Sequence, residues 1–544
     1  MNRCLAPIAA SILIAVSPVG CGSQPAPREV QGKLQTQVTS VVGKPGATVR
    51  GEPLLEREAV AKFYEARQYR SAWPSERSSD DLLSAIQDVQ ADGLTPSDYH
   101  PDSIRKLLDE QKTAHDPAIQ ADLDVLMTDA VAAIIDDMRY GRVRPASVNP
   151  AWNMDPREGA PPLETELDKV VGADRVRTAL QAERPKHFIY QGLVKALADL
   201  RKIESEGGWG TIPAGPTLKM GVRSDRVTAL RERLQKSGEL EAGRPANPTR
   251  FDADVDRGVK LFQARHRLDE DGVVGKSVLA ELNVPVAARI GQVRVNLERA
   301  RWVLGGLDND FVLVNLPAFK AYLIRGGRNI WESRIVIGQE ARQTPSFRAT
   351  MQTVVFNPDW TVPPTILAED VLDGMKQGKN VLAEKRLQVY DKDGNEVSPS
   401  SIDWDNASAD NFPYTLKQDP GEDNALGRVK FLFPNKYSIY LHDTPSKSLF
   451  ESNKRTYSSG CIRIERPLDL AEILLSGQDG WDRAKMEQVI ADGKTTNVDL
   501  EHRIPVVIVY WTVSVGASGE VRYTRDPYDL DAPLLGALSG ARRS

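Results

Sequence analysis

The sequence predicts a multidomain α+β protein, and three observations support this prediction. The chain has 544 residues, more than a single hydrophobic core usually serves. Its N-terminal half repeats apolar residues at helical spacing, for example over residues 122–138. Its C-terminal half has short runs of β-branched and aromatic residues between glycine-containing turns, such as residues 311–316 and 504–515. We therefore expect separate helical and mainly β domains.

The N-terminal segment has the features of an export signal. Arg3 precedes an apolar run over residues 5–16, and a short stretch of small residues and proline ends at Cys21. We expect residues 1–21 to be a signal peptide, with Cys21 acylated as in a bacterial lipoprotein. An ordinary signal peptide or an uncleaved anchor is the alternative. The apolar run is shorter than a membrane-crossing helix requires.

Two regions of different character follow this signal. Residues 22–51 are rich in proline, glycine and small polar residues and lack a helical period, which predicts a flexible linker. Residues 52–215 show helical periodicity that Pro96 and Pro101 interrupt, which predicts a helical domain. Its pattern indicates no catalytic chemistry.

A smaller module is expected over residues 216–288. Residues 227–234 and 255–262 place apolar side chains at helical spacing. Asp271-Gly272 then provides a tight turn before a third helical stretch. This order predicts a small three-helix domain, and the alternative is a generic helical hairpin that uses the Asp-Gly pair to turn.

The predicted β domain covers residues 289–528. Residues 366–420 interrupt its strands with a helix-like stretch and a polar run rich in serine, aspartate and asparagine. Long insertions of this kind more often carry function than filler. Residues 529–544 contain no motif, and we expect them to be a tail.

Cys461 is the strongest candidate for chemistry. His442 lies 19 positions before it at the end of a strand-like run, and Ser458-Ser459-Gly460 makes the adjoining backbone permissive. A free thiol has a pKa near 8.5, so attack at neutral pH needs a base, and imidazole can supply one. The pattern predicts a Cys–His pair. On its own it also fits a buried thiol and an unrelated histidine, which is the commoner case.

The order of residues around this pair resembles a known family. The segments that carry the resemblance are Asn424-Ala-Leu-Gly427, Lys430-Phe431, Phe433-Pro-Asn435, Tyr440-Leu-His-Asp-Thr-Pro445 and Ser458-Ser-Gly-Cys-Ile-Arg463. They are similar to the signature of the L,D-transpeptidase (YkuD) catalytic domain. The longer order resembles the large periplasmic L,D-transpeptidases of the YcbB type. Ser459 stands where many smaller members carry a second histidine, a departure that the large subgroup shares.

The resemblance implies an architecture and a location. It implies that residues 52–215 are a helical scaffold domain and that residues 216–288 are a peptidoglycan-binding type 1 domain. Residues 289–528 would be a mainly β YkuD-type catalytic domain, with residues 366–420 as a mobile cap over its active site. The implied location is the periplasm of a Gram-negative bacterium, with an outer-membrane anchor if Cys21 is lipidated.

The resemblance also implies a reaction. Cys461 would attack the diaminopimelate carbonyl at the third position of a tetrapeptide stem, release D-Ala and form a thioester. An amine from a second stem would then resolve the thioester and leave a 3→3 cross-link in peptidoglycan. His442 would be the acid–base group, with a backbone carbonyl after it as the orienting partner.

Further roles on the nucleophile loop follow from the same resemblance. The backbone N–H groups of Cys461 and Gly460 are candidate oxyanion donors. The hydroxyls of Ser458 and Ser459 would position the loop, with simple packing as the alternative.

Three residues are candidates for binding the substrate. Arg463 would hold a stem carboxylate, or else form a surface salt bridge. Trp360 would wall the substrate cleft, or else serve as a core aromatic residue. Tyr440, two positions before His442, is a further candidate for substrate contact.

Composition limits the cofactors and partners. No cofactor is expected for thioester chemistry, and Cys4, Cys21 and Cys461 lack metal-ligand spacing. A net charge of −5 argues against nucleic-acid binding. We expect peptidoglycan stem peptides as substrates, cell-wall synthases as candidate partners, and membrane contact only through a lipid on Cys21.

Three other functions remain open from the sequence. With water as the acceptor, the same Cys–His pair would make an L,D-carboxypeptidase. With the lysine of a small lipoprotein as the acceptor, it would make a protein-anchoring transferase. A non-catalytic scaffold that binds peptidoglycan through residues 216–288 is the alternative from another class.

Overall fold

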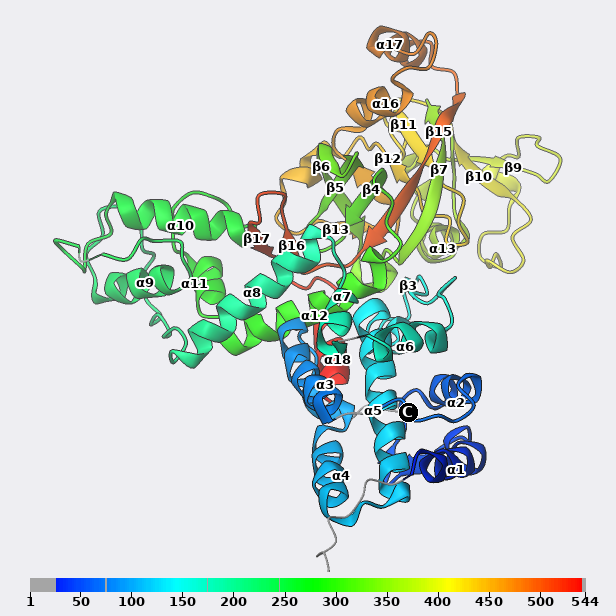
Figure 1. Cartoon of the computed structure of the whole chain (residues 1–544). Coiled ribbons are helices and arrows are strands. Elements are labelled where there is room, and N and C mark those ends of the chain that lie inside the picture. The colour runs from blue at the N-terminus through cyan, green and yellow to red at the C-terminus, as the bar shows by residue number, and fades with distance from the viewer. Residues whose placement is uncertain (1–25, 74–75, 174, 244, 541–544) are drawn as a thin grey trace, which may run out of the picture.

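The computed structural model describes residues 26–73, 76–173, 175–243 and 245–540. The N-terminal helices lie at one end of the molecule, a small helical module lies to one side, and a β domain lies at the other end (Figure 1). The expected signal peptide and Cys21 lie outside the described residues. Within the described residues, no helix has both the length and the apolar character that a membrane span needs.

The N-terminal region is helical, as predicted. Its helices are α1 (Pro27–Gln37), α2 (Arg57–Ala66), α3 (Glu76–Asp88), α4 (Pro101–Ala114), α5 (Pro117–Tyr140), α6 (Leu163–Val171), α7 (Val176–Ala182) and α8 (Phe188–Ser205), with a short pair of strands β1 (Thr48–Val49) and β2 (Glu52–Pro53). The central helix α5 begins at the N-cap Asp116, whose carboxylate accepts the Ala118 N–H at 2.8 Å. Most of α5 is buried because the surrounding helices pack on nearly all its sides.

The prediction of a flexible linker over residues 22–51 is wrong for its described part. Residues 27–37 form α1, and a π-helical turn follows over Val38–Val42. Val30, Leu34 and Val38 recur every fourth residue and are at most 4% exposed. This spacing gives the segment one apolar face, which packs into the core around α5.

The small module consists of three helices, as predicted: α9 (Asp225–Lys236), α10 (Ala253–Arg265) and α11 (Lys276–Leu282). The Asp271-Gly272 turn directs the chain into α11. Gly272 has φ +72°, and a Cβ there would lie 2.3 Å from Asp256 Oδ1, so the position requires glycine. The module therefore has its own small core and its own turn chemistry.

Helix α12 (Val286–Leu304) joins this module to the β domain and packs beside α8. The predicted tail instead forms helix α18 (Asp531–Ser539) against α12. Leu534 and Leu538 are buried, and Asp531 pairs with Arg299 of α12. The tail prediction is therefore wrong for residues 529–540, because a short apolar helix needs no sequence motif to dock.

The β domain is built on a ten-stranded sheet, in the order β11-β12-β14-β6-β5-β4-β15-β7-β3, with β13 paired to β6. Its strands are β3 (Trp152–Asn153), β4 (Phe311–Asn315), β5 (Lys320–Arg325), β6 (Arg328–Gly338), β7 (Ser346–Phe356), β11 (Val429–Leu432), β12 (Leu441–His442), β13 (Thr456–Ser458), β14 (Ile462–Ile464) and β15 (Thr496–Val509). Because β11 also pairs with β7, the strands close on themselves.

The two faces of this sheet pack against different cores. Val506 and Ile508 of β15 enter the core inside the β domain, whereas Val507 and Val509 enter the core shared with α8 and α12. Helices α16 (Pro467–Leu475) and α17 (Arg483–Ala491) contact β15 and β7, and the hairpin of β16 (Val513–Val515) and β17 (Val521–Tyr523) reaches α8.

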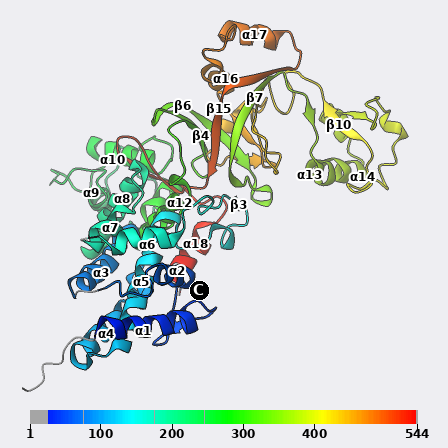
Figure 2. The ribbon, with the colours of Figure 1, turned by 45° about the vertical axis from the view of Figure 1, so that its right-hand side comes forward.

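The insertion over residues 366–420 forms a separate lobe that projects beside the sheet (Figure 2). The lobe begins slightly before the predicted insertion, with β8 (Trp360–Thr361) and α13 (Pro364–Ile366). It continues with a π-helical turn (Leu367–Leu372), α14 (Asp373–Lys376) and α15 (Val381–Glu384), and β8 forms a three-stranded sheet with β10 (Thr415–Gln418) and β9 (Gln388–Tyr390). The lobe has its own hydrophobic core, so we call it the cap.

Candidate active site

Strand pairing places Cys461 and His442 on adjoining strands. Strands β12 and β14 run parallel, with Leu441 opposite Ile462 and His442 opposite Arg463. Strand β11 pairs with the other side of β12 and places Lys430 opposite His442. The Ile462 N–H donates to the Tyr440 carbonyl at 3.1 Å, so Tyr440 and Cys461 adjoin at the ends of these strands.

Side-chain alternation distinguishes these residues from the fully buried positions of the same strands, although Tyr440 and Cys461 also pack against that core. Leu441, Ile462 and Phe431 are fully buried in the β-domain core. The alternate positions therefore point to the opposite face of the sheet. These positions are Lys430, Tyr440, His442, Cys461 and Arg463, which together we call the catalytic face.

The thiol of Cys461 is partly exposed and donates to the Ser438 carbonyl at 3.7 Å. Burial by its surroundings raises the pKa of this thiol above its ordinary value. Groups of Tyr440 and the cations Lys430 and Arg463 act in the opposite direction. The thiol is therefore protonated at rest, next to groups that would favour its thiolate.

His442 is buried and oriented by the backbone. Its Nδ1 contacts the carbonyl of Asp443, which confirms the expectation of a carbonyl partner after the histidine. Burial, followed by the charges of Arg463 and Lys430, lowers the pKa of His442 to about 3, although the carbonyls of Asp443 and Leu426 favour the protonated ring. The imidazole is thus neutral near pH 7. In this conformation the thiol donates to Ser438 rather than to the ring.

Residues 458–460 hold the nucleophile loop rigidly. The Ser458 hydroxyl accepts the Gly460 N–H at 3.1 Å and donates to the Cys461 carbonyl. Gly460 has φ +115°, a conformation that favours glycine, and its carbonyl accepts from Thr344 Oγ1 at 2.7 Å. The Gly460 N–H, a candidate oxyanion donor, thus donates to the Ser458 hydroxyl in this conformation, and its role stays a prediction. The Cys461 N–H makes no hydrogen bond to any described residue and stays a candidate.

The aromatic candidates line the boundary between the catalytic face and the cap. Trp360 is 7% exposed and belongs to the cap core, where Tyr440 packs against it. The Tyr440 ring lies edge-on to His442, with centroids 5.6 Å apart, and Lys430 Nζ lies 4.1 Å from the centre of the Tyr440 ring. Burial and the neighbouring Cys461 raise the pKa of Tyr440. Tyr440 thus touches both the reactive face and its cover.

Arg342 links the nucleophile loop to the cap, a contact that the sequence did not predict. Its guanidinium donates to Ser459 Oγ at 2.9 Å, to both Asp370 oxygens at 2.7 and 3.1 Å, and to Glu369 at 2.8 Å. Asp370 and Glu369 belong to the π-helical turn of the cap. The Arg342 side chain therefore connects Ser459 of that loop to the cap.

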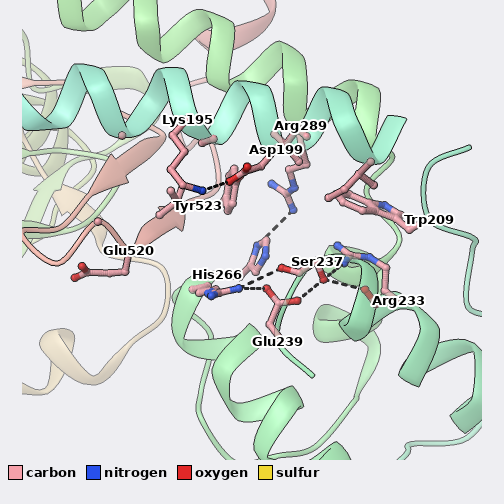
Figure 3. A pocket seen from close by; sticks show the side chains of 17 residues that line it. Lys195, Asp199, Trp209, Arg233, Ser237, Glu239, His266, Arg289, Glu520 and Tyr523 are labelled. Atoms are coloured by element: carbon pink, nitrogen blue, oxygen red, sulfur yellow. Dashed lines mark hydrogen bonds and ion pairs between the residues drawn. The ribbon is translucent and has the colours of Figure 1, made fainter. Parts of the chain in front are cut away.

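A separate cavity of about 260 Å³ lies between α8, the three-helix module and the β16–β17 hairpin (Figure 3). Its polar wall is a network in which Arg265 pairs with Glu239, and Arg233 donates to Ser237. No residue of β11, β12 or β14 lines it. We call this region the junction. Across the described ranges, no group of three or more His, Cys, Asp or Glu gathers as a metal site.

Three regions of the chain match known protein families. Residues 58–197 match the family described as "Scaffold domain", and residues 223–282 match "Putative peptidoglycan binding domain". Residues 309–508 match the YkuD family, described as "L,D-transpeptidase catalytic domain". The last range contains His442 and Cys461.

Among curated proteins, a Haemophilus influenzae protein named "Putative L,D-transpeptidase" is 38% identical over 244 residues, which is 45% of this chain and 48% of the relative. The chain thus spans about half the length of the curated relative it matches.

Two crystal structures overlap with 54% of the chain at 13% identity. One is an L,D-transpeptidase from Xylanimonas cellulosilytica, with a TM-score of 0.17 over 98% of that chain. The other is a fused Zn-dependent amidase/peptidase/peptidoglycan-binding domain-containing protein from Clostridium acetobutylicum, with a TM-score of 0.15 over 100% of that chain. TM-scores this low do not establish a common fold.

The family matches and the curated relative assign the β domain and the three-helix module, although they do not single out the YcbB type. The chain carries a YkuD-family L,D-transpeptidase catalytic domain together with a peptidoglycan-binding domain, and is homologous to a putative L,D-transpeptidase.

Proposed function

We propose that this protein forms 3→3 cross-links in peptidoglycan through a thioester on Cys461. The observation that supports the proposal is the parallel pairing of β12 and β14, because this register and side-chain alternation assign the positions of Cys461 and His442 to the same face of the sheet. A nucleophile and a neutral base on adjoining strands are what acyl transfer by cysteine requires.

The first half of the reaction acylates the enzyme. The Cys461 thiol turns from the Ser438 carbonyl toward His442, and the imidazole takes its proton as the sulfur attacks the diaminopimelate carbonyl of a tetrapeptide stem. Oxyanion charge then develops beside the Cys461 N–H, which is the candidate donor. The carbon–nitrogen bond breaks, D-Ala leaves with the proton from His442, and a thioester remains.

The second half returns the enzyme to its resting state. The side-chain amine of diaminopimelate in a second stem attacks the thioester carbonyl, and His442 takes a proton from this amine. The carbon–sulfur bond breaks, Cys461 regains its proton, and the product is a 3→3 cross-linked dimer. Arg463 would hold a stem carboxylate, and Trp360 and Tyr440 would bound the peptide.

We further propose a location outside the cytoplasm, in the periplasm of a Gram-negative bacterium. Domains that act on peptidoglycan support an extracytoplasmic location. An acylated Cys21 would add an outer-membrane anchor, and cell-wall synthases are candidate partners.

Product analysis tests the proposed reaction. Purified protein is incubated with disaccharide tetrapeptide, and the products are separated and identified by mass spectrometry. We expect D-Ala release and 3→3 dimers with the wild type, and neither with Cys461→Ala. Tripeptide monomers alone would show that water is the acceptor, and transfer only to an added lipoprotein lysine would show a protein-anchoring enzyme. If the wild type left the substrate unchanged, the result would favour a non-catalytic scaffold that binds peptidoglycan.

A further inference from the structure

Two positive side chains on the catalytic face have no counter-ion. Lys430 and Arg463 flank His442, one on each neighbouring strand. Among the residues that the structure describes, neither makes an ion pair or a side-chain hydrogen bond. The Arg463 Nε is buried and unpartnered. The Lys430 ammonium lies 4.1 Å from the centre of the Tyr440 ring.

Other arginines nearby do have carboxylate partners. Arg334 of the same sheet binds both Glu451 and Glu465, and Arg342 binds two cap carboxylates. Burying a charge without a partner costs free energy, and burial lowers the pKa of both Lys430 and Arg463. Proteins retain such uncompensated charges mainly at functional sites.

The carboxylates close to this face do not neutralise it. Asp443, next to His442, already pairs with Lys447 and accepts the Arg428 N–H at 2.9 Å. Asp359 acts on Lys430 only from beyond ion-pair distance. Among the described residues, the face therefore holds two desolvated cations and no carboxylate at ion-pair distance from them.

We propose that Lys430 and Arg463 together form a subsite for a carboxylate of the peptide stem, a proposal that rests on the proposed function. The subsite lies two positions along the strands from Cys461, a separation of about 7 Å. A tetrapeptide stem carries carboxylates within that distance of the attacked carbonyl, on the leaving D-Ala and on the D-centre of diaminopimelate. The two cations on either side of His442 would clamp one of them.

An occupied subsite would also change His442. Burial lowers the pKa of this histidine most, and the charges of Arg463 and Lys430 lower it further. A bound carboxylate would offset the part due to these charges and make the imidazole a stronger base. The substrate would thus activate the base by binding.

The test compares kcat/KM for disaccharide tetrapeptides that differ only in one carboxylate. One arm uses the free acid, one uses D-alaninamide at the C-terminus, and one uses the carboxamide at the D-centre of diaminopimelate. The enzymes are the wild type, Lys430→Met and Arg463→Gln, with Lys430→Arg as the rescue. Lys436→Met is the matched control, because the exposed Lys436 also lies over a tyrosine ring, 5.1 Å from the centre of Tyr437.

We expect the wild type to lose about tenfold to a hundredfold in kcat/KM on one of the two amides, which identifies the carboxylate. The kcat/KM of Lys430→Met on the free acid should be lower than that of the wild type by a similar factor. On that amide, Lys430→Met and the wild type should differ little. Lys430→Arg should recover most of the loss, Lys436→Met should match the wild type, and all variants should keep the wild-type thermal midpoint.

Two results would overturn the proposal. The first is a wild type that turns over the free acid and both amides equally. The second is a Lys430→Met variant whose kcat/KM falls by the same factor on the amide as on the free acid. A wild type with no turnover of the free acid would instead remove the proposed function itself, and the subsite with it.

Discussion

The junction and the catalytic face both bury positive charge, but they treat it differently. In the junction, Arg289 pairs with Glu281, and most other cations likewise have a carboxylate of the chain beside them. Arg233, which has none, stacks over Trp209 with its guanidinium carbon 3.8 Å from the ring centroid. On the catalytic face, two cations flank a histidine, and neither forms an ion pair with a carboxylate of the described part of the chain. The junction thus pairs most of its cations within the chain, whereas we propose that the cations of the catalytic face bind an anion of the substrate.

Breaking an ion pair of the junction should produce the largest change in stability. Glu281→Gln would leave Arg289, which is 5% exposed, buried without its counter-ion. We expect a loss of about 3–5 kcal/mol in the free energy of unfolding, measured from amide exchange in α11 and α12. The control is Asp199→Asn, which breaks an exposed pair with Lys195 and should cost less than about 1 kcal/mol. If Glu281→Gln and Asp199→Asn both lost less than about 1 kcal/mol, the buried ion pair would not stabilise the junction, and its contrast with the catalytic face would fail.

Acidification should weaken both regions through one histidine in each. Burial lowers the pKa of His442 to about 3 and that of His266 in the junction to about 4, below the ordinary value of 6.5. Between pH 6.5 and these lowered values, the unfolded chain binds more protons than the folded chain. The free energy of unfolding is therefore highest above pH 6.5 and falls as the pH drops toward 4 and then 3. Each histidine should contribute a loss of about 1–2 kcal/mol between pH 7.5 and 5.

Thermal midpoints at the two pH values measure this effect. His442→Gln and His266→Gln should each shrink the shift of the midpoint between pH 7.5 and 5 relative to the wild type. A shift that neither substitution reduces would contradict the assignment of neutral, buried imidazoles.

The contact between the cap and the nucleophile loop should have an intermediate effect. Arg342→Gln removes hydrogen bonds to Asp370 and Ser459, so we expect amide exchange in the cap to rise about tenfold, equivalent to about 1–2 kcal/mol. Arg386→Gln breaks an exposed ion pair with Asp423 in the same lobe and serves as the control. Exchange that rises equally in both variants would show that Arg342 does not hold the cap.

The smallest change in stability is expected on the catalytic face itself. Lys430→Met removes a cation that has no ion pair, so the free energy of unfolding should stay within about 1 kcal/mol of the wild type or rise slightly. Denaturant titration measures this value. A loss of several kcal/mol would mean that Lys430 has a stabilising partner, and the contrast between the two regions would fail.

Local periodicity was enough to predict most of the fold. The helical spacing of residues 122–138 became α5, and the alternating strands became the closed sheet. The segment around α1 was missed because its proline and glycine content outweighed the four-residue spacing from Val30 to Val42. Helix α18 was missed because its stability comes from docking on α12, which no local pattern records.

The candidate site was predictable only in part, for a related reason. Cys461 and His442 lie in recognisable segments, but the partners that complete the face come from strand register, which one sequence does not reveal. Lys430 belonged to a segment of the family resemblance, Lys430-Phe431, but the sequence assigned it no role of its own. Arg342 left no local signal, because its partners lie 27 or more positions away.

The central claim is that Cys461 acylates, and the mass of the intact protein after incubation with a carbapenem tests it most directly. We predict a stable adduct of one carbapenem per chain, located on Cys461 by peptide mapping and absent from Cys461→Ala. A wild type that stays unmodified, or an adduct that persists in Cys461→Ala, would contradict the account.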